Sequence, residues 1–300
     1  MNSVIRQKRG RDAFALSEES VAADQRSDAL IGRLLLDAGK LTQIEVNRVA
    51  VAQREKNLSF GEAAARLGLV SKEDVARALA QQFRYPYVTG PSNLDRTLVA
   101  AYRPFSATAE ALRELRSQLQ LRWFDDQRRP LAIVSPRRRS GCSRLAANLA
   151  IVFSQLGERT LLVDANFRRP SQQALFGVQQ GLGLSDFLAG RCRLGDALTT
   201  IPPFEHLKLL CMGTQPPNPQ ELLGQGTFQY LLEIAPANFD VVIIDTPPIL
   251  EYADAQIIAA AAGGCLLTAR RHLTRLADVE RAREKFEPAR AVLVGTAILG

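Results

Sequence analysis

The stretch Leu131-Ala-Ile-Val-Ser-Pro-Arg-Arg-Arg-Ser-Gly-Cys-Ser-Arg-Leu-Ala-Ala-Asn-Leu-Ala150 decides the fold of this 300-residue chain. The short apolar run from Leu131 to Val134 predicts a buried strand. A polar loop that contains Pro136 and Gly141 follows, and an amphipathic helix pattern begins directly after it. A strand, a loop and a helix in this order are the usual setting of a phosphate-binding loop.

The helix after the loop is predicted to end at Gly157, because glycine commonly ends helices. Its apolar side chains recur at helical spacing and are expected to face a core on one side. These side chains are Leu145, Leu149, Val152 and Leu156.

The loop departs from the standard phosphate-binding pattern G-x-x-x-x-G-K-[ST] at the lysine. Cys142 stands in that position, and a neutral thiol is only a weak hydrogen-bond donor. Ser143 stands where the motif places a hydroxyl on Mg²⁺. Backbone amides at the helix start and nearby arginines are the other candidate phosphate contacts. The candidate nucleotide-binding residues of this segment are Arg139, Ser140, Gly141, Cys142, Ser143 and Arg144, with Arg137 and Arg138 beside them.

Short apolar runs alternate with helical patterns from Leu131 onward. This alternation predicts an α/β fold with a mostly parallel, doubly wound sheet. Ligands of such sheets bind at the carboxyl ends of the strands. The predicted strands are Leu131–Ser135, Thr160–Asp164, Leu207–Cys211, Asp240–Asp245, Cys265–Thr268 and Ala291–Ile298.

Two of these strands end in an aspartate. Asp245 ends an apolar strand in the Walker B arrangement, which holds Mg²⁺ directly or through water. Asp164 ends another strand and is followed by Arg168, although a helix cap or a turn would also explain an aspartate there. The loop and the two aspartates, in this order, indicate a nucleotide site.

Residues 28–88 contain an internal repeat, in which Gly39 matches Gly68 and Thr42 matches Ser71. Each copy predicts a short helix, a turn and a second helix that begins with a capping box. Two such helix pairs can bury a shared core where one could not. The sequence therefore predicts a small all-helical domain ahead of the α/β domain.

The remaining segments complete the predicted domain organisation. Residues 1–27 are polar and basic and predict a disordered tail. Residues 89–107 contain glycine and prolines with little periodicity and predict a linker. The α/β domain is then expected to occupy residues 108–300.

The segment from Ala107 to Trp123 is predicted to be a helix. Glu110, Arg113 and Arg116 recur every third residue and therefore lie along one stripe. An exposed row of ion pairs is the simplest interpretation of this stripe. The apolar face of the helix is formed by Leu112, Leu115 and Leu119.

The composition is that of an ordinary globular protein with a mildly basic net charge of +7. This charge fits an anionic ligand, nucleic acid or an acidic membrane surface, and uneven surface charge explains it equally well. The four cysteines form no C-x-x-C pair, which is typical of a reducing cytosol rather than of a disulfide framework or a zinc site. No N-terminal apolar segment resembles a signal peptide, so we expect a cytoplasmic protein.

Taken together, residues 104–300 resemble the cytoplasmic catalytic domain of bacterial tyrosine kinases (BY-kinases). These kinases serve exopolysaccharide export and are relatives of the MinD/ParA ATPases. The sequence from Glu251 to Gln256 and the fused helical domain are similar to EpsG-type chain-length-determinant tyrosine autokinases. The pieces that carry the resemblance are Glu110-Ala-Leu-Arg-Glu-Leu-Arg116, Ala146-Ala-Asn-Leu-Ala150, Val163-Asp-Ala-Asn-Phe-Arg-Arg-Pro170, Pro216-Pro-Asn-Pro-Gln-Glu-Leu-Leu223 and Ile244-Asp-Thr-Pro-Pro248.

The resemblance implies a P-loop NTPase fold of the MinD/ParA type with ATP and Mg²⁺ as ligands. It implies that Asp164 and Asp245 are catalytic, that Ser143 and Asp245 bind the metal, and that Arg168 belongs to the nucleotide site. Asn166 replaces the second aspartate of the family's D-x-D motif. No tyrosine-rich segment follows the last predicted strand, so we expect no self-phosphorylation on a C-terminal tyrosine cluster.

The resemblance also implies partners. The helix with Glu110, Arg113 and Arg116 corresponds to the E-x-x-R-x-x-R helix of ring assembly, which implies a homo-oligomer. A membrane-bound polysaccharide chain-length determinant is the implied partner, and it would hold the protein at the inner membrane from the cytoplasmic side. Nucleic acid is not an expected partner.

The N-terminal repeat resembles the helical domain of type II secretion and pilus ATPases. The resemblance is carried by Ile31-Gly-Arg-Leu-Leu-Leu-Asp-Ala-Gly-Lys-Leu41 and its echo Phe60-Gly-Glu-Ala-Ala-Ala-Arg-Leu-Gly-Leu-Val70. Some relatives bind cyclic di-GMP through an arginine just before the first glycine of each copy. Apolar residues and Ser59 stand there in this chain, so we expect a protein-docking module rather than a cyclic di-GMP site.

Three functions are compatible with the sequence. The first is a tyrosine kinase that uses Mg-ATP, with Asp164 activating a tyrosine hydroxyl. The second is a catalytically degraded kinase that acts as an assembly or regulatory partner of the chain-length determinant. The third is an ATP-dependent dimerisation switch. The position of Cys142 bears on all three, because loss of the lysine removes a large electrostatic contribution to phosphate binding.

Overall fold

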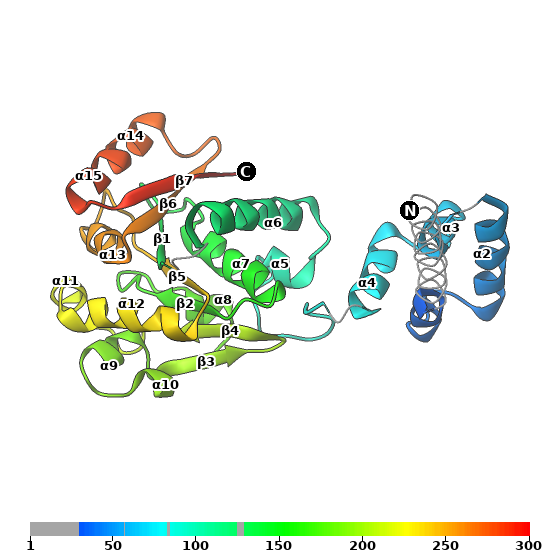
Figure 1. The fold of residues 1–300 in the computed structure, drawn as a ribbon, viewed down its shortest axis with the longest axis horizontal. Helices are drawn as coiled ribbons and strands as arrows, with labels where there is room; N and C mark the ends of the chain where they lie inside the picture. The colour runs from blue at the N-terminus through cyan, green and yellow to red at the C-terminus, as the bar shows by residue number, and fades with distance from the viewer. Residues whose placement is uncertain (1–29, 57, 83–84, 125–128) are drawn as a thin grey trace, which may run out of the picture. The chain divides into compact units, whose positions relative to one another are not determined.

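A computed structural model describes residues 30–56, 58–82, 85–124 and 129–300 (Figure 1). The chain divides into two compact units, Met1–Tyr85 and Pro86–Gly300. The predicted basic tail, residues 1–27, lies outside the described residues. Among the residues that are described, no helix is long and apolar enough to cross a membrane.

The second unit is built on a seven-stranded sheet in the order β3-β4-β2-β5-β1-β6-β7. All neighbouring strands pair in parallel except β3 and β4, which pair antiparallel. The strands are β1 (Leu131–Val134), β2 (Thr160–Asp164), β3 (Leu198–Ile201), β4 (Phe204–Leu210), β5 (Val241–Asp245), β6 (Gly264–Arg270) and β7 (Val292–Leu299).

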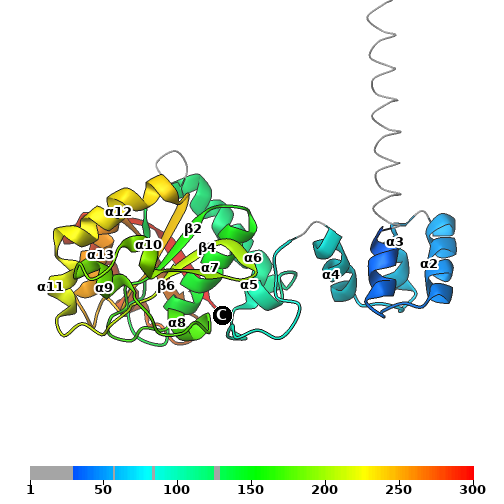
Figure 2. The same ribbon diagram turned by 90° about the horizontal axis from the view of Figure 1, so that it is seen from below.

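Helices cover both faces of this sheet. On one face α7 packs against β1, β2, β4 and β5, with α5 and α6 beside it, and on the other face α12 and α13 pack against the strands (Figures 1 and 2). The helices are α5 (Val99–Tyr102), α6 (Ala107–Leu119), η1 (Gln120–Phe124), α7 (Cys142–Gln155), α8 (Gln172–Leu175), α9 (Leu184–Leu188), α10 (Leu194–Ala197), α11 (Pro219–Leu223), α12 (Gly226–Asn238), α13 (Asp254–Ala262), α14 (Leu276–Glu284) and α15 (Phe286–Ala289).

The predicted α/β fold with a mostly parallel, doubly wound sheet is confirmed. All six predicted strands are present, and their bounds differ from the prediction by a few residues at most. The sequence analysis missed β3, the antiparallel strand at one edge of the sheet. This strand has only four residues and three of them are not buried, so it carries no apolar run that a strand prediction could detect.

The segment 89–107, predicted as a linker, packs instead on the α/β unit. Leu98, Ala100 and Ala101 are fully buried in the core that α7 also lines. The side chain of Asn148 on α7 accepts a hydrogen bond from the Ala100 backbone N–H at 2.9 Å. Because α5 has only four residues, its apolar side chains are too few to give the helical periodicity that identifies a longer helix.

The helix α7 is buried along almost its whole length, with only Ser143 and Arg144 outside the core. Leu145, Leu149 and Val152 face the core as predicted. The prediction for Leu156 is wrong, because α7 ends at Gln155 and the Leu156 side chain is 51% exposed. This buried helix fixes the position of the loop that precedes it.

The described part of the first unit consists of a helix at residues 30–37 followed by α2 (Gln43–Lys56), α3 (Phe60–Arg66) and α4 (Lys72–Gln82). The predicted repeat is visible in its turns, because Gly39 and Gly68 adopt nearly identical left-handed conformations with φ of 66° and 67°. Both predicted capping boxes form, one between Thr42 and Glu45 and the other between Ser71 and Asp74. The two helix pairs share one apolar cluster.

Candidate functional site

The 135–141 loop connects β1 to α7 at the carboxyl end of the sheet. Gly141 is the N-cap of α7 and has a φ of 84°, a conformation that favours glycine. A Cβ atom on Gly141 would lie 3.0 Å from Cδ1 of Leu299, the last residue of β7. The loop therefore has the strand–loop–helix geometry of a phosphate-binding loop, and β7 closes it from one side.

Cys142 directs its thiol into the fold. Its Sγ donates a hydrogen bond to the backbone carbonyl of Ile133 on β1, 3.1 Å away, and the residue is buried. Burial raises the pKa of the Cys142 thiol well above its usual value, and the nearby Asp245 carboxylate raises it further. The side chain at the lysine position is therefore neutral and turned away from the space above the loop.

Two loop arginines form ion pairs with carboxylates from distant parts of the chain. Arg137 binds Asp278 on α14 through two hydrogen bonds of 2.8 and 3.1 Å. Arg138 binds Glu251 through its Nε at 2.5 Å and through its backbone N–H at 3.1 Å, and it also contacts the Tyr252 hydroxyl. These contacts therefore occupy two of the arginines that the sequence analysis named as candidate phosphate contacts.

The remaining residues of the loop are less constrained. Arg139 and Arg144 are exposed, and neither forms an ion pair within the described part of the chain. The backbone carbonyl of Arg139 accepts a hydrogen bond from Arg270. Ser140 is buried and donates its hydroxyl hydrogen to the backbone carbonyl of Arg137. Positive charge remains beside the loop, but it is exposed to water.

Asp164 is fully buried, and its carboxylate is used by the backbone. It accepts N–H groups from Asn166 at 3.2 Å, Ser171 at 3.0 Å and Gln172 at 2.9 Å, directly before α8. These contacts match the turn residue that the sequence analysis set beside the catalytic interpretation, and both interpretations stay open. A carboxylate held in this way orients the turn between β2 and α8.

Asp245 is also fully buried but keeps one oxygen without a partner. Its Oδ2 accepts a hydrogen bond from Gln172, whereas its Oδ1 has no hydrogen-bond partner among the described residues. Ser143, at the start of α7, lies close enough to Asp245 to lower the pKa of its carboxyl. An unpaired buried carboxylate oxygen beside a hydroxyl suits a hard divalent cation such as Mg²⁺, so the residues present fit that ion.

Gln172 is the site residue that the sequence analysis missed. It is fully buried, and its Nε2 donates to Asp245 Oδ2 at 2.8 Å and to the Ser143 backbone carbonyl at 3.0 Å. Both partners only accept hydrogen bonds, so the amide nitrogen must face them. The Gln172 amide therefore links β5 to α7. It donates to the same carboxylate that a cation would bind. No sequence signal marked Gln172, because glutamine belongs to none of the motifs.

Asp164 and Asp245 are neighbours across the sheet, in register between β2 and β5. Burial raises the pKa of Asp164 to about 7, and the adjacent Asp245 carboxylate raises it as well. Burial also raises the pKa of Asp245, and the hydrogen bond from Gln172, together with the nearby polar side chains of Ser143 and Cys142, partly offsets that rise. Two adjacent buried carboxyl groups repel each other when both are ionised, and a bound cation would reduce this repulsion.

Arg168, predicted to belong to the nucleotide site, forms an ion pair outside the loop. Its guanidinium binds Asp254 at the start of α13 through hydrogen bonds of 2.8 and 3.1 Å. It also lies 5.0 Å from the centre of the Tyr252 ring. Tyr252 thus lies against both Arg138 and Arg168, and this links the loop to the region after β5.

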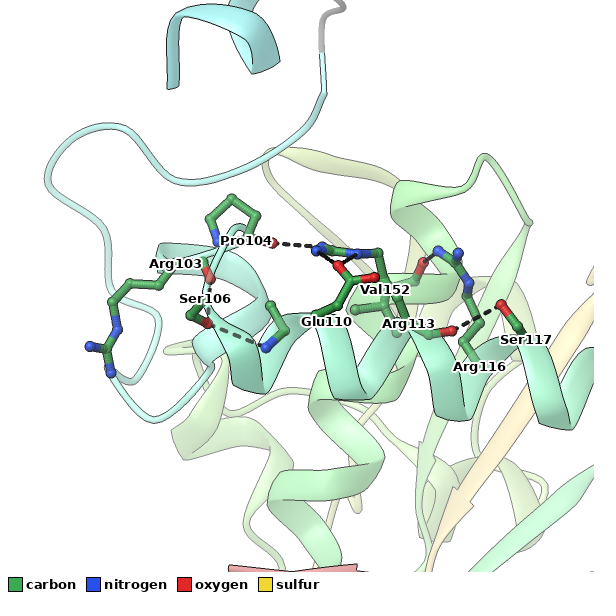
Figure 3. Close-up of polar contacts among 9 residues, drawn as sticks. Arg103, Pro104, Ser106, Glu110, Arg113, Arg116, Ser117 and Val152 are labelled. Atoms are coloured by element: carbon green, nitrogen blue, oxygen red, sulfur yellow. Dashed lines mark hydrogen bonds and ion pairs between the residues drawn. The ribbon is translucent and has the colours of Figure 1, made fainter. Parts of the chain in front are cut away.

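The predicted stripe of Glu110, Arg113 and Arg116 lies along α6 (Figure 3). Arg113 pairs with Glu110 in its own helix and donates to the Pro104 carbonyl at 2.6 Å. Arg116 donates to the Val152 carbonyl of α7 at 3.0 Å. The three side chains line a surface hollow of about 440 Å³ together with Glu114, Ser117 and Gln118.

The structure therefore brings Ser143 and Asp245 together, with Asp164 and Gln172 next to them. It keeps the Cys142 thiol inside the fold and binds Arg168 to Asp254.

No protein-family model matches this chain. It is 34% identical over 209 residues to the tyrosine-protein kinase YwqD of Bacillus subtilis, which covers 70% of this chain and 88% of that protein. It is 36% identical over 192 residues to the tyrosine-protein kinase wzc of Salmonella typhimurium, and the match covers 63% of this chain. The chain spans only 26% of the length of that larger relative.

Solved structures give the same result. The kinase domain of the Escherichia coli tyrosine kinase ETK superposes with a TM-score of 0.67 at 29% identity, covering 74% of this chain and 86% of that domain. The chimerical protein CapA2B2 superposes with a TM-score of 0.64 at 29% identity, covering 74% of this chain and 97% of that one. With its α/β sheet, its 135–141 loop and its similarity to YwqD, this chain belongs to the family of bacterial tyrosine kinases.

Proposed function

We propose that this chain is a catalytically degraded member of its family, which acts as an assembly or regulatory partner in exopolysaccharide chain-length control. One observation carries the proposal. At the position of the phosphate-binding lysine stands Cys142, whose neutral thiol binds the Ile133 carbonyl inside the fold. Arg144, the cation in the first turn of α7, is exposed to water rather than enclosed in the loop.

The loop arginines do not easily offset this loss. Arg137 and Arg138 would have to leave Asp278 and Glu251 before they could contact a phosphate. Each of these charge-assisted contacts is itself favourable, so the exchange gains little. Removal of one preorganised contact to a transferred group typically lowers transition-state stabilisation by about 3 kcal/mol. Phosphoryl transfer from ATP is therefore not the expected activity.

A tyrosine kinase that uses Mg-ATP is the second candidate, and one observation favours it. Asp245 keeps an unpaired buried oxygen next to Ser143, and these two residues would hold Mg²⁺. A bound Mg²⁺ would neutralise charge on phosphate oxygens. In this candidate Asp164 would contact the substrate hydroxyl, although its carboxylate already accepts three backbone N–H groups.

The assembly role rests on α6 and on the family. Glu110, Arg113 and Arg116 line an exposed hollow on α6, where a second copy of the chain could bind. A membrane-bound chain-length determinant is the proposed partner, with the chain on the cytoplasmic side of the inner membrane. Relatives of this chain include a putative tyrosine-protein kinase in the cps region of Klebsiella pneumoniae, which supports a role in polysaccharide export.

Calorimetric titration of Mg-ATP into the full chain tests the proposal, with a tyrosine-phosphorylation assay beside it. We expect no measurable binding by the unmodified chain and no phosphotyrosine. Cys142→Lys should bind Mg-ATP measurably, since an ammonium group at the start of α7 restores a charge-assisted contact to phosphate. Cys142→Ser, which restores no charge, is the matched control. Tight Mg-ATP binding and phosphotyrosine formation by the unmodified chain would establish the second candidate instead.

A further inference from the structure

The carboxyl end of the sheet carries an exposed apolar and basic surface next to β7. It is formed by Arg271, Leu273, Arg275, Leu276 and Ile298, which we term the basic apolar corner. The side chains of Leu273, Leu276 and Ile298 are 53%, 72% and 74% exposed. Ile298 stands opposite Ala269 in the register of β6 and β7, so it lies beside the end of β6. The turn with Leu273 follows that end, and Leu276 begins α14 directly after it. Three large apolar side chains are therefore exposed on segments that follow or flank the end of β6.

The turn between β6 and α14 is fixed by hydrogen bonds. The backbone carbonyl of Arg270 accepts N–H groups from Leu273 at 3.1 Å and Thr274 at 2.9 Å, and the Thr274 hydroxyl accepts the Arg270 N–H at 2.8 Å. The Arg271 N–H binds the Leu299 carbonyl at 2.7 Å. A preformed turn loses little conformational entropy when it binds a partner. The exposure of the leucines is thus built into the fold.

The charge of the corner is positive and available. Arg271 and Arg275 are exposed, and no ion pair to either is found in the described part of the chain. The nearest acidic residue in the sequence, Asp278, is bound by Arg137 and lies 3.9 Å from Arg281. Arg139 lies next to the corner, because its carbonyl accepts a hydrogen bond from Arg270. Anionic partners are therefore favoured.

We propose that the basic apolar corner docks directly onto an anionic membrane surface. Arginines attracted to acidic headgroups, with leucine and isoleucine entering the boundary of the acyl chains, are the combination by which peripheral proteins bind such surfaces. Nucleic acid would use the arginines but would leave three apolar side chains in water. The chain's net charge of +7 adds long-range attraction to the same surface.

This docking does not depend on ATP binding, nor on a protein partner at the membrane. It would orient the α/β unit with the carboxyl end of its sheet toward the lipid, because the turn follows β6 and Ile298 lies near the end of β7. The 135–141 loop lies at the same end, since Arg137 binds Asp278 and Gly141 lies against Leu299. The corner would thus add a lipid contact of the chain's own to the proposed protein partner.

Sedimentation with lipid vesicles tests the proposal on the full chain. We expect binding to vesicles of phosphatidylcholine mixed with phosphatidylglycerol and none to phosphatidylcholine alone. Arg271→Glu with Arg275→Glu should weaken binding by at least about tenfold, because each basic side chain near an anionic surface contributes about fivefold. Leu273→Ser with Leu276→Ser should weaken it to a similar degree while leaving the net charge unchanged.

Matched controls lie elsewhere on the α/β unit. Arg193→Glu with Lys208→Glu makes the same change of charge and should lose only the long-range part of the attraction, so it should bind more tightly than the corner arginine variant. Leu182→Ser removes another exposed leucine and should bind as the unmodified chain does. Equal binding to both kinds of vesicle, or no binding to either, would overturn the proposal. Loss of binding in the arginine variant but not in the leucine variant would also overturn it, because that pattern indicates general affinity for polyanions such as nucleic acid.

Discussion

The 135–141 loop and the α6 stripe both carry charged side chains, but they hold them differently. In the loop, Arg137 and Arg138 bind carboxylates that are more than 100 positions away in the sequence. In the stripe, Glu110 and Arg113 pair within one helix, and the helix is tied to its surroundings through the carbonyls of Pro104 and Val152. The loop charges hold separate elements of the fold together, whereas the ion pair of the stripe is local.

The difference indicates which site is ready for an external partner. An ion pair within one helix contributes about 1 kcal/mol or less, and the Glu110 side chain is 61% exposed, so this carboxylate can exchange its partner for one on another molecule at little cost. A charge that binds two distant segments cannot be exchanged without loosening both. The stripe is therefore suited to assembly, and the loop is suited to keeping its own shape. Each prediction below changes one side of this comparison.

The largest effect is expected for the buried aspartates behind the loop. Burial raises the pKa of Asp164 to about 7, whereas an unfolded aspartate titrates near pH 4. The stabilising effect of the neutral form is thus complete below about pH 4 and is lost as pH rises to about 7. At about 1.4 kcal/mol for each pH unit between these values, the loss is on the order of 4 kcal/mol. Asp164→Asn should remove most of this slope in urea denaturation between pH 4 and 8.

Asp186 provides the control with the opposite sign. Burial raises the pKa of Asp186, but hydrogen bonds from Thr214 and Gly183 outweigh it, so that the pKa is lowered. Its stabilising effect is present at neutral pH and is lost as pH falls. Asp186→Asn should therefore destabilise the chain most at neutral pH. If the unfolding free energies of Asp164→Asn and the unmodified chain depended on pH in the same way, the ionised buried pair would not destabilise the fold.

A smaller effect is expected when the amide between β5 and α7 is removed. Gln172→Leu takes away the donor that binds Asp245 and the Ser143 carbonyl, and leaves a buried carboxylate without that bond. Such a loss costs about 1–3 kcal/mol in unfolding free energy at pH 8. Mg²⁺ should restore more stability to this variant than to the unmodified chain, because Oδ2 of Asp245 then also lacks a partner and the cation can bind both carboxylate oxygens.

Gln173→Leu, the same substitution one residue later at a half-buried position, is the matched control. This control should lower the unfolding free energy by less than Gln172→Leu does. Its stabilisation by Mg²⁺ should equal that of the unmodified chain. If Mg²⁺ stabilised Gln172→Leu no more than the control, Asp245 would not be the cation site. The site behind the 135–141 loop would then have no candidate ligand.

The sequence alone predicts the sheet well, because its central strands are unbroken apolar runs followed by loops and helical patterns. Prediction fails where the elements are short: β3 and α5 each have four residues. The segment 89–107 was predicted as a linker for the same reason, since its few apolar residues gain their meaning only from contact with α7.

The candidate site divides in a similar way. Asp245 and Ser143 were found because a motif places them at a strand end and a helix start, and the fold brings both to one point. Gln172 could not be found, since its role depends on two acceptors that come from distant parts of the chain. The sequence analysis named Arg138 and Arg168 as candidate phosphate contacts, but only the fold shows that Glu251 and Asp254 already bind them.

The smallest change in stability is expected at the α6 stripe, where the effect should appear in assembly instead. Glu110→Ala with Arg113→Ala removes an exposed pair and should lower the unfolding free energy by only about 1 kcal/mol. Light scattering after gel filtration should nevertheless show the unmodified chain as an oligomer and this variant as a monomer. Glu73→Ala with Arg77→Ala, which removes an exposed pair of the same residue types on α4, should leave the oligomer intact. A monomeric unmodified chain, or an oligomer that survives the α6 variant, would mean that the stripe is an ordinary surface ion pair, and the contrast with the loop would then concern stability alone.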